Sequence, residues 1–123
     1  MTTTMSDDYY CDFILNGRVP VTVVAETDRV LAFHHVFRTW DTHIVVIPKN
    51  HVRSLADVDD PDLLAELFQV VIRVIKEQGF DTSNYKVITN GGSYQSNQHL
   101  HIHLVSGRPL SPEYPGAKGE LAV

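Results

Sequence analysis

The amino-acid sequence predicts a single α+β domain, in which one long helix covers one face of a five-stranded antiparallel sheet. Three observations support this fold class: β-branched segments joined by short polar turns, one stretch with apolar residues at helical spacing, and a late segment of strictly alternating polar and apolar residues. The 123 residues are enough for one domain core and too few for two. We therefore treat residues 1–123 as one domain.

The first part of the chain predicts a short helix followed by three strands. Residues 1–8 are polar and expected to be flexible, and residues 9–15 form a short helix or turn that Gly17 closes. Valine-rich and β-branched segments then predict three strands, at residues 19–25, 30–36 and 43–47. Pro48 ends the third strand, because proline cannot donate a hydrogen bond to a sheet.

The long helix is predicted between Asp60 and Gln78. Asp60 can cap its amino end, Pro61 fits the first helical position, and Gly79 follows its last turn. One apolar stripe with steps of three and four residues should face the sheet, formed by Leu64, Leu67, Phe68, Val71, Val74 and Ile75.

Two further strands and an irregular tail are predicted after the helix. The strands cover residues 85–89 and 99–105, and a turn at residues 90–93 follows the first of them. The tail, residues 109–123, is rich in proline and glycine, so it should be irregular.

Composition and charge argue against several functional classes. The formal net charge of −5 disfavours a general nucleic-acid or anionic-membrane binder, since either needs a basic face. The single cysteine, Cys11, excludes an internal disulfide and a multi-cysteine zinc knuckle. No apolar run approaches the roughly twenty residues that span a bilayer, and the first residues lack the features of a secretory signal. We therefore expect a cytoplasmic protein.

The most informative segment contains His99, His101 and His103, which alternate with apolar residues. Side chains on a strand point to opposite faces in turn, so the three imidazoles should share one face along roughly 13 Å, at about 3.3 Å per residue. The apolar residues between them should face the helix. The chemistry of this histidine face is the central question.

Three interpretations of the histidine face are open: the solvent side of a half-buried strand, a metal site, or a catalytic centre that acts at phosphorus. Three histidines on a flat strand do not converge on a metal unless the strand bends, and no acidic residue lies close by to orient the rings. For catalysis, a neutral imidazole can attack a phosphate ester or amide and form a phosphohistidine-type intermediate. Neighbouring imidazoles can fix its tautomer and shuttle protons near neutral pH. We favour catalysis, and expect neither a metal nor a cofactor.

The loop before the histidines favours the catalytic interpretation. Residues 90–96 read Asn-Gly-Gly-Ser-Tyr-Gln-Ser and offer exposed amides and short hydroxyls. Such a loop can hold phosphate oxygens with its backbone N–H groups, although a Gly-Gly pair alone is more often just a turn.

The segment from His99 to Val105 resembles the signature of the histidine triad (HIT) family, in which histidine and apolar residues alternate and two further apolar residues close the motif. The resemblance runs from about Phe13 to Arg108 and is carried by residues 30–34, 43–51 and 95–96 as well. It is strongest for the nucleoside phosphoramidase-type branch.

The resemblance implies a fold, an assembly and a chemistry. Similar members are homodimers whose two five-stranded sheets join edge to edge into ten strands. They hydrolyse nucleoside phosphoramidates and related nucleotides, or transfer nucleotidyl groups from them. The expected substrate is thus a purine nucleotide or nucleotide conjugate, and the expected intermediate is a nucleotidyl-histidine.

The resemblance also implies the roles of individual residues. His101 is expected to be the nucleophile, His103 and His99 to orient it and hydrogen-bond the phosphate, and Ser96 to hold the phosphate or leaving group. Substrate binding is assigned to five further residues: Asn90, Gln95, His43, His34 and His35. His43 would pack behind the triad, with a purely structural buried histidine as the alternative. His51 follows the third strand, where capping a loop is the competing role.

The sequence departs from similar members at three places. His35 stands where they have an acidic residue for the ribose hydroxyls, and a histidine cannot accept two hydrogen bonds as a carboxylate does. Tyr94 replaces a loop glycine. Residues 9–12, Tyr-Tyr-Cys-Asp, stand where many bacterial members have Cys-x-x-Cys, so we expect no structural zinc site of that kind.

Two other functions remain alternatives on the sequence alone. One is hydrolysis of dinucleoside polyphosphates. The other is a catalytically weak nucleotide-binding regulatory dimer, for which His35 and Tyr94 are the motivating departures. The sequence does not identify the physiological substrate, its leaving group or its base.

Overall fold

A single antiparallel sheet organises the computed structural model, which describes residues 8–110. Its strands are β1 (Val23–Glu26), β2 (Val30–His34), β3 (Trp40–Pro48), β4 (Lys86–Thr89) and β5 (Ile102–Pro109). Their order across the sheet is β1-β2-β3-β5-β4, so β1 and β4 form its edges. The predicted antiparallel sheet of five strands is confirmed.

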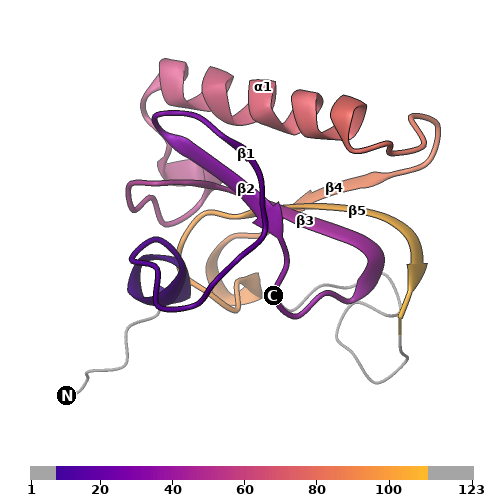
Figure 1. The fold of residues 1–123 in the computed structure, drawn as a ribbon. Helices are drawn as coiled ribbons and strands as arrows, with labels where there is room; N and C mark the ends of the chain where they lie inside the picture. The colour runs from indigo at the N-terminus through magenta and orange to yellow at the C-terminus, as the bar shows by residue number, and fades with distance from the viewer. Residues whose placement is uncertain (1–7, 111–123) are drawn as a thin grey trace.

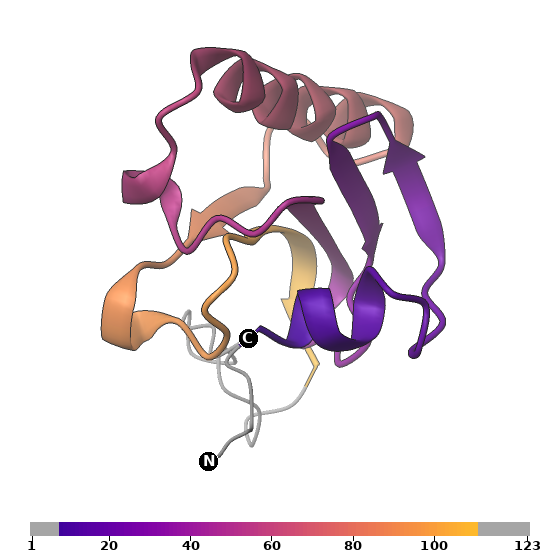
Figure 2. The ribbon, with the colours of Figure 1, turned by 90° about the vertical axis from the view of Figure 1, so that its left-hand side faces the viewer.

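Helical elements lie on both faces of this sheet. The long helix α1 (Pro61–Glu77) crosses one face, and the short helix η1 (Tyr10–Ile14) lies against the other (Figures 1 and 2). Two single turns complete the fold. The turn η2 (Leu55–Asp57) lies between β3 and α1, and η3 (Gly92–Tyr94) lies between β4 and β5. The predicted long helix and short N-terminal helix are both confirmed.

The ends of α1 lie where the local sequence places them. The Asp60 carboxylate accepts hydrogen bonds from the backbone N–H groups of Asp62 (2.9 Å) and Leu63 (3.4 Å), which caps the amino end. The buried stripe differs from the prediction by a small rotation of the helix. Leu63 and Val70 are buried, whereas Leu64 and Phe68 lie at the border of the stripe and are partly exposed.

Two apolar cores flank the sheet. The larger core packs α1 against residues of β2, β3 and β5 on the sheet face that α1 covers, including Ala32, Ile44, Ile102 and Leu104. The smaller core lies under η1 and contains Tyr10, Ile14, Leu31, Phe33, Val45 and Ile47. His103 pairs with Val45 across β3 and β5, so it belongs to the η1 face, as the alternation predicts. The functional site therefore lies on the η1 face.

Several predicted boundaries are wrong by a few residues. β1 is shorter than predicted, whereas β3 begins at Trp40, before the predicted start of the third strand at residue 43. β5 begins only at Ile102, so His99 and His101 precede it. The reason is that the Leu100 N–H donates to the Val52 carbonyl (2.7 Å) and not to a neighbouring strand.

The ends of the domain also differ from the prediction. Asp8, grouped with the flexible residues 1–8, is buried and hydrogen-bonded. Pro109, grouped with the irregular tail, ends β5, while residues 111–123 lie outside the described residues. Within residues 8–110, no helix has the length and apolar character needed to cross a membrane.

Candidate functional site

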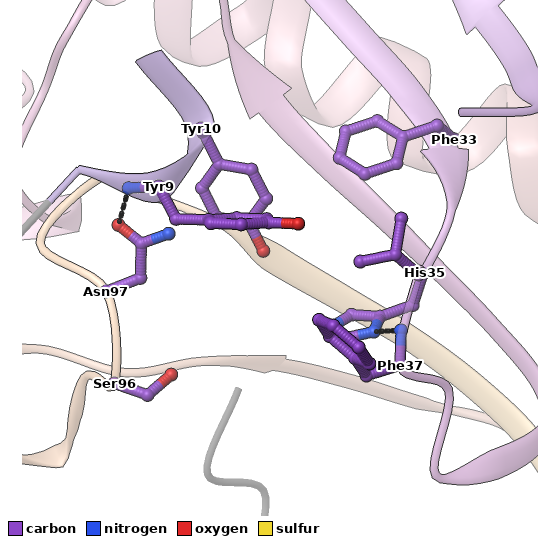
Figure 3. Close-up of a pocket in the computed structure, with 8 residues that line it drawn as sticks. Tyr9, Tyr10, Phe33, His35, Phe37, Ser96 and Asn97 are labelled. Carbon is purple, nitrogen blue, oxygen red and sulfur yellow. Dashed lines mark hydrogen bonds between the residues drawn. The ribbon is translucent and has the colours of Figure 1, made fainter. Parts of the chain in front are cut away.

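A cavity of about 240 Å³ opens on the η1 face of the sheet (Figure 3). The aromatic rings come from η1 and from β2 with the loop that follows it, and polar groups come from the loop before β5. The described residues that line it are Tyr9, Tyr10, Phe33, His35, Val36, Phe37, Ser96 and Asn97. Tyr10 connects the cavity with the triad, because its ring lies 5.2 Å from the ring of His101.

The backbone determines which nitrogen of His101 carries the proton. Nδ1 lies 2.6 Å from the carbonyl oxygen of His99, and a carbonyl can only accept, so Nδ1–H donates. A neutral His101 therefore has its lone pair on Nε2. The carbonyl of His101 itself accepts a hydrogen bond from the Thr89 hydroxyl (2.9 Å), which ties this residue to β4.

A second chain of hydrogen bonds determines the tautomers of His43 and His103. The Thr39 N–H donates to Nδ1 of His43 (3.1 Å), so the proton of neutral His43 is on Nε2. That N–H donates to Nδ1 of His103 (2.9 Å), which leaves a proton on Nε2 of His103. Nε2 of His103 is buried and has no hydrogen-bond partner among the described residues. The chain therefore ends in an N–H donor beside His101, whose ring lies 4.9 Å away.

His35 joins this group from the end of β2. Its ring stacks on His43 at 4.2 Å, and its Nδ1 accepts a hydrogen bond from the Phe37 N–H (2.9 Å), so its proton is on Nε2 as well. This Nε2 is also buried without a partner in residues 8–110. His35 thus adds a second N–H donor to the wall of the cavity.

Burial keeps these imidazoles neutral. It lowers the pKa of His35 to about 4 and that of His43 to about 3, and neighbouring histidines add to both effects. Burial lowers the pKa of His101 too, and it holds the pKa of His103 well below its ordinary value. Near pH 7 the site therefore contains neutral rings, as a nucleophile and its hydrogen-bonding partners require.

The remaining predicted residues divide between the cavity and the loop. Ser96 lines the cavity, and Asn90 is half-buried directly after β4. Gln95 is buried within its own loop, where it accepts from the Gly92 N–H (3.2 Å) and donates to the Arg53 carbonyl (2.7 Å). It therefore supports the loop and occupies one of the backbone amides expected to hold phosphate. The His34 side chain is exposed and is not among the described residues that line the cavity.

His99 packs against the same Tyr10 ring as His101, at 5.7 Å and 5.2 Å, but its ring nitrogens are bonded elsewhere. Its Nε2 donates to the Pro48 carbonyl (2.8 Å), and its Nδ1 lies 2.9 Å from a carboxylate oxygen of Asp8. Both ring nitrogens are engaged, so the ring does not face a phosphate bound at His101. The backbone carbonyl of His99 orients the His101 ring.

Asp8, Cys11, His51 and His99 form a second cluster beside the triad, with one ligand atom from each within 4.8 Å of the others. Burial raises the pKa of Asp8, but hydrogen bonds from Cys11, His99 and His51 outweigh this effect and lower it to about 2. Burial and the neighbouring Asp8 raise the pKa of Cys11 to about 12.

The tautomers show which histidine cluster suits a metal ion. His35, His43 and His103 also lie within 4.8 Å of one another, but backbone N–H groups occupy Nδ1 of His35 and His43 and leave protons on their Nε2 atoms. In His99 the Nε2–H donates to the Pro48 carbonyl (2.8 Å), and Nδ1 lies 2.9 Å from a carboxylate oxygen of Asp8, where a proton or a metal ion can lie between the two atoms. Nitrogen, sulfur and oxygen ligands together suit Zn²⁺. The cluster at Asp8 therefore fits a metal, whereas the cluster at His35 presents donors.

This cluster has no Cys-x-x-Cys signature in the sequence, because residues 9–12 contain a single cysteine. Asp8 and Cys11 have that three-residue spacing, with a carboxylate in place of the first thiolate. Reading the spacing by ligand chemistry, and not by cysteine alone, would have found the pair. His51, for which capping was the competing role, is hydrogen-bonded to Asp8 in this cluster.

Comparison with known proteins gives one family. A model of the HIT domain matches residues 16–110. A 13.2 kDa HIT-like protein of Azospirillum brasilense is 37% identical over 107 residues, which cover 80% of this chain and 85% of the relative. A 14 kDa zinc-binding protein of Zea mays is 35% identical over 106 residues, which cover 81% of this chain and 82% of the relative.

Solved structures agree with this match. A histidine triad protein from Clostridium difficile is similar with a TM-score of 0.73 and 39% identity, covering 90% of this chain and 97% of that one. A HIT family hydrolase from Legionella pneumophila has a TM-score of 0.72 and 32% identity, and the match covers 86% of this chain and 97% of that one. A histidine triad nucleotide-binding protein from Candida albicans has a TM-score of 0.71 and 26% identity, and the match covers 88% of this chain and 82% of that one.

Proposed function

Because the chain belongs to the HIT family, we propose that it cleaves a nucleoside phosphoramidate or related nucleotide conjugate through a nucleotidyl-histidine intermediate. The observation that carries this proposal is the tautomer of His101. Its Nδ1–H is held by the His99 carbonyl, so a neutral ring offers Nε2 as the nucleophile.

The reaction takes two displacements at phosphorus. Nε2 of His101 attacks the α-phosphorus, the phosphorus–nitrogen bond of the substrate breaks, and the amine leaves with a proton from solvent. The His99 carbonyl stabilises the positive charge on the ring through Nδ1–H. Water then attacks the phosphorus, loses its proton to solvent, and frees His101 as the neutral imidazole.

The donor chain that ends at His103 serves the phosphoryl oxygens. Nε2–H of His103 has no acceptor among the described residues, and it lies beside the nucleophile. A buried donor that meets its acceptor only in the complex stabilises charge that develops on that acceptor. Ser96, on the cavity wall, is placed to hold the phosphate or the departing amine.

The cavity is suited to the nucleoside. Tyr9, Phe33 and Phe37 provide apolar ring surfaces, which bind planar bases by stacking and burial. His35 lies between these rings and His103, at the position that a sugar would occupy between base and phosphorus. The names of two similar structures, a hydrolase from Legionella pneumophila and a nucleotide-binding protein from Candida albicans, agree with this function.

A homodimer is the assembly that we propose. β4 is an edge strand, and Val87 on β4 and Tyr85 just before it are exposed. An apolar groove lined by Ile72, Ile75 and Tyr85 lies beside this edge. Edge strands with exposed apolar side chains pair readily with a second copy. Sedimentation should show a dimer for the wild type and a monomer for Val87→Lys.

The decisive experiment measures release of AMP from an adenosine phosphoramidate. We expect turnover by the wild type and a loss of at least about 1000-fold in His101→Ala, because the nucleophile is gone. His34→Ala, which changes an exposed histidine outside the cavity, should stay within about twofold. Ser96→Ala should lose less than His101→Ala.

Other outcomes favour the alternatives. If the folded wild type binds AMP without turnover, the protein is a nucleotide-binding regulator. If it cleaves diadenosine polyphosphates much faster than the phosphoramidate, the leaving group is a nucleotide. If His101→Ala retains wild-type turnover, the nucleotidyl-histidine mechanism is wrong.

A further inference from the structure

His35 offers the cavity one hydrogen-bond donor and no free acceptor. Its imidazole is 6% exposed, and its Nδ1 already accepts a hydrogen bond from the Phe37 N–H (2.9 Å). That bond requires a lone pair on Nδ1, so the ring is neutral and its only N–H proton is on Nε2. Nε2 is buried and has no hydrogen-bond partner within residues 8–110. A buried donor without a partner costs free energy, so a ligand that supplies an acceptor here is stabilised.

The other described side chains on the His35 side of the cavity are apolar. They belong to Phe33, Val36 and Phe37. The lining residues with polar side chains come from η1 and from the loop before β5, across the cavity from His35 (Figure 3): Tyr9, Tyr10, Ser96 and Asn97. A hydroxyl group bound on the His35 side thus meets one donor and several carbon atoms, but no side chain that can accept its proton.

The sugar of a bound nucleotide lies on this side of the cavity in the proposed complex. The His35 ring lies 5.8 Å from the ring of His103, which stands beside the nucleophile. The aromatic rings of Phe33 and Phe37 lie on the other side of His35 and are suited to the base. With the base on these rings and the phosphorus at His101, the sugar lies between them, within reach of His35.

Ribose and 2′-deoxyribose differ in what they ask of such a wall. Ribose brings hydroxyl groups at 2′ and 3′, each with a proton that needs an acceptor, whereas 2′-deoxyribose brings only the one at 3′. A site selects strongly for a hydroxyl when its own buried group is left unpaired by the analogue that lacks it. The single N–H of His35 makes no such demand, because the oxygen at 3′ can satisfy it in both sugars.

We propose that His35 determines sugar specificity, and that the substrates of this enzyme include 2′-deoxynucleoside conjugates, bound and cleaved at least as well as their ribonucleoside counterparts. A carboxylate at this position would accept hydrogen bonds from both hydroxyls of ribose and would select ribose. This inference rests on the proposed function and extends it to a second class of substrate.

The Kd values for AMP and for 2′-deoxy-AMP, measured by calorimetry, test this specificity together with kcat/KM for the two 5′-phosphoramidates. For the wild type we expect the deoxy ligand to be disfavoured by no more than about threefold in either measurement. His35→Asp should shift both ratios at least about tenfold towards ribose. His34→Asp, the same change at the exposed neighbour, should leave the ratios of the wild type unaltered. Each ratio compares two ligands on one protein, so a partial loss of folded His35→Asp cancels.

The outcomes separate this inference from the proposed function. Wild-type protein that cleaves both phosphoramidates but prefers ribose by more than about threefold would overturn the inference and leave the proposed function standing. Unchanged ratios in His35→Asp would show that His35 does not determine the sugar. Should the Asp variant fail to fold, the wild-type ratios still decide whether deoxynucleotides are substrates. A wild type that neither binds nor cleaves any of these nucleotides would contradict the proposed function, and the inference would fall with it.

Discussion

Replacing His35 by asparagine should make the protein less sensitive to acid. The imidazole is 6% exposed, stacks on His43 at 4.2 Å and accepts a hydrogen bond from the Phe37 N–H. Burial, with a smaller contribution from His101, lowers its pKa from 6.5 to about 4 in the folded protein. Asparagine does not titrate, so the variant lacks this linkage to pH.

The sign follows from which state binds the proton. Between about pH 6.5 and pH 4 the unfolded chain protonates His35 while the folded protein does not, so stability falls as the pH falls through this window. Below the folded pKa both states are protonated and no further loss occurs. Integrating from pH 7.5 to pH 5 gives about 2 kcal/mol of stability that this one group removes.

Urea denaturation at pH 7.5 and at pH 5 measures the difference. The free energy of unfolding should drop by about 2 kcal/mol more in the wild type than in His35→Asn. His34→Asn, the same substitution at the exposed neighbour on β2, should behave like the wild type. An equal drop in wild type and His35→Asn would show that the folded protein does not hold His35 neutral, and would contradict the role of its Nδ1 as the acceptor for the Phe37 N–H.

Three further changes test the packing around the site. Leu67→Ala should lower the free energy of unfolding by about 3 kcal/mol in urea, because Leu67 is fully buried under α1, whereas Leu64→Ala at the border of the stripe should cost less than about 1 kcal/mol. Gly107→Ala should lower the melting temperature more than Gly17→Ala, since both have positive φ but only at Gly107 would the new Cβ come within 2.6 Å of Asp41. Thr89→Val should cost about 1 kcal/mol in the same urea assay and reduce kcat for the phosphoramidate, because the His101 carbonyl loses its hydrogen bond from the hydroxyl.

Local interactions explain which parts of the fold could be predicted from the sequence. The limits of α1 follow from Asp60, Pro61 and Gly79, whose effects act within one turn of the helix, and the structure confirms them. The alternation around His103 likewise reflects the two faces of a strand. By contrast, the start of β5 depends on the bond between Leu100 and Val52, which are far apart in sequence, so no local pattern could reveal it.

The arrangement of the site was less predictable for the same reason. Asp8 and His99 are 91 positions apart, and their contact depends on η1 folding back onto the segment before β5. A polar residue near the start of the chain is expected to be flexible unless something holds it, and nothing in the neighbouring residues indicates that His51 and His99 do so. The three-residue spacing of Asp8 and Cys11 was the one available signal.

The histidines of the motif differ in chemistry because the protein presents different groups to their second nitrogens. His101 donates a hydrogen bond from Nδ1–H to the carbonyl of His99, which leaves the lone pair of a neutral ring on Nε2. His103 accepts a hydrogen bond from His43 on Nδ1, in a chain that starts at the Thr39 N–H, and so carries its own proton on Nε2 as a donor. His99 donates from Nε2 to the Pro48 carbonyl, and its Nδ1 is paired with the Asp8 carboxylate. In the proposed mechanism one residue type at alternate positions thus yields a nucleophile in His101 and a hydrogen-bond donor in His103, and exchanging their carbonyl and N–H partners would exchange these roles.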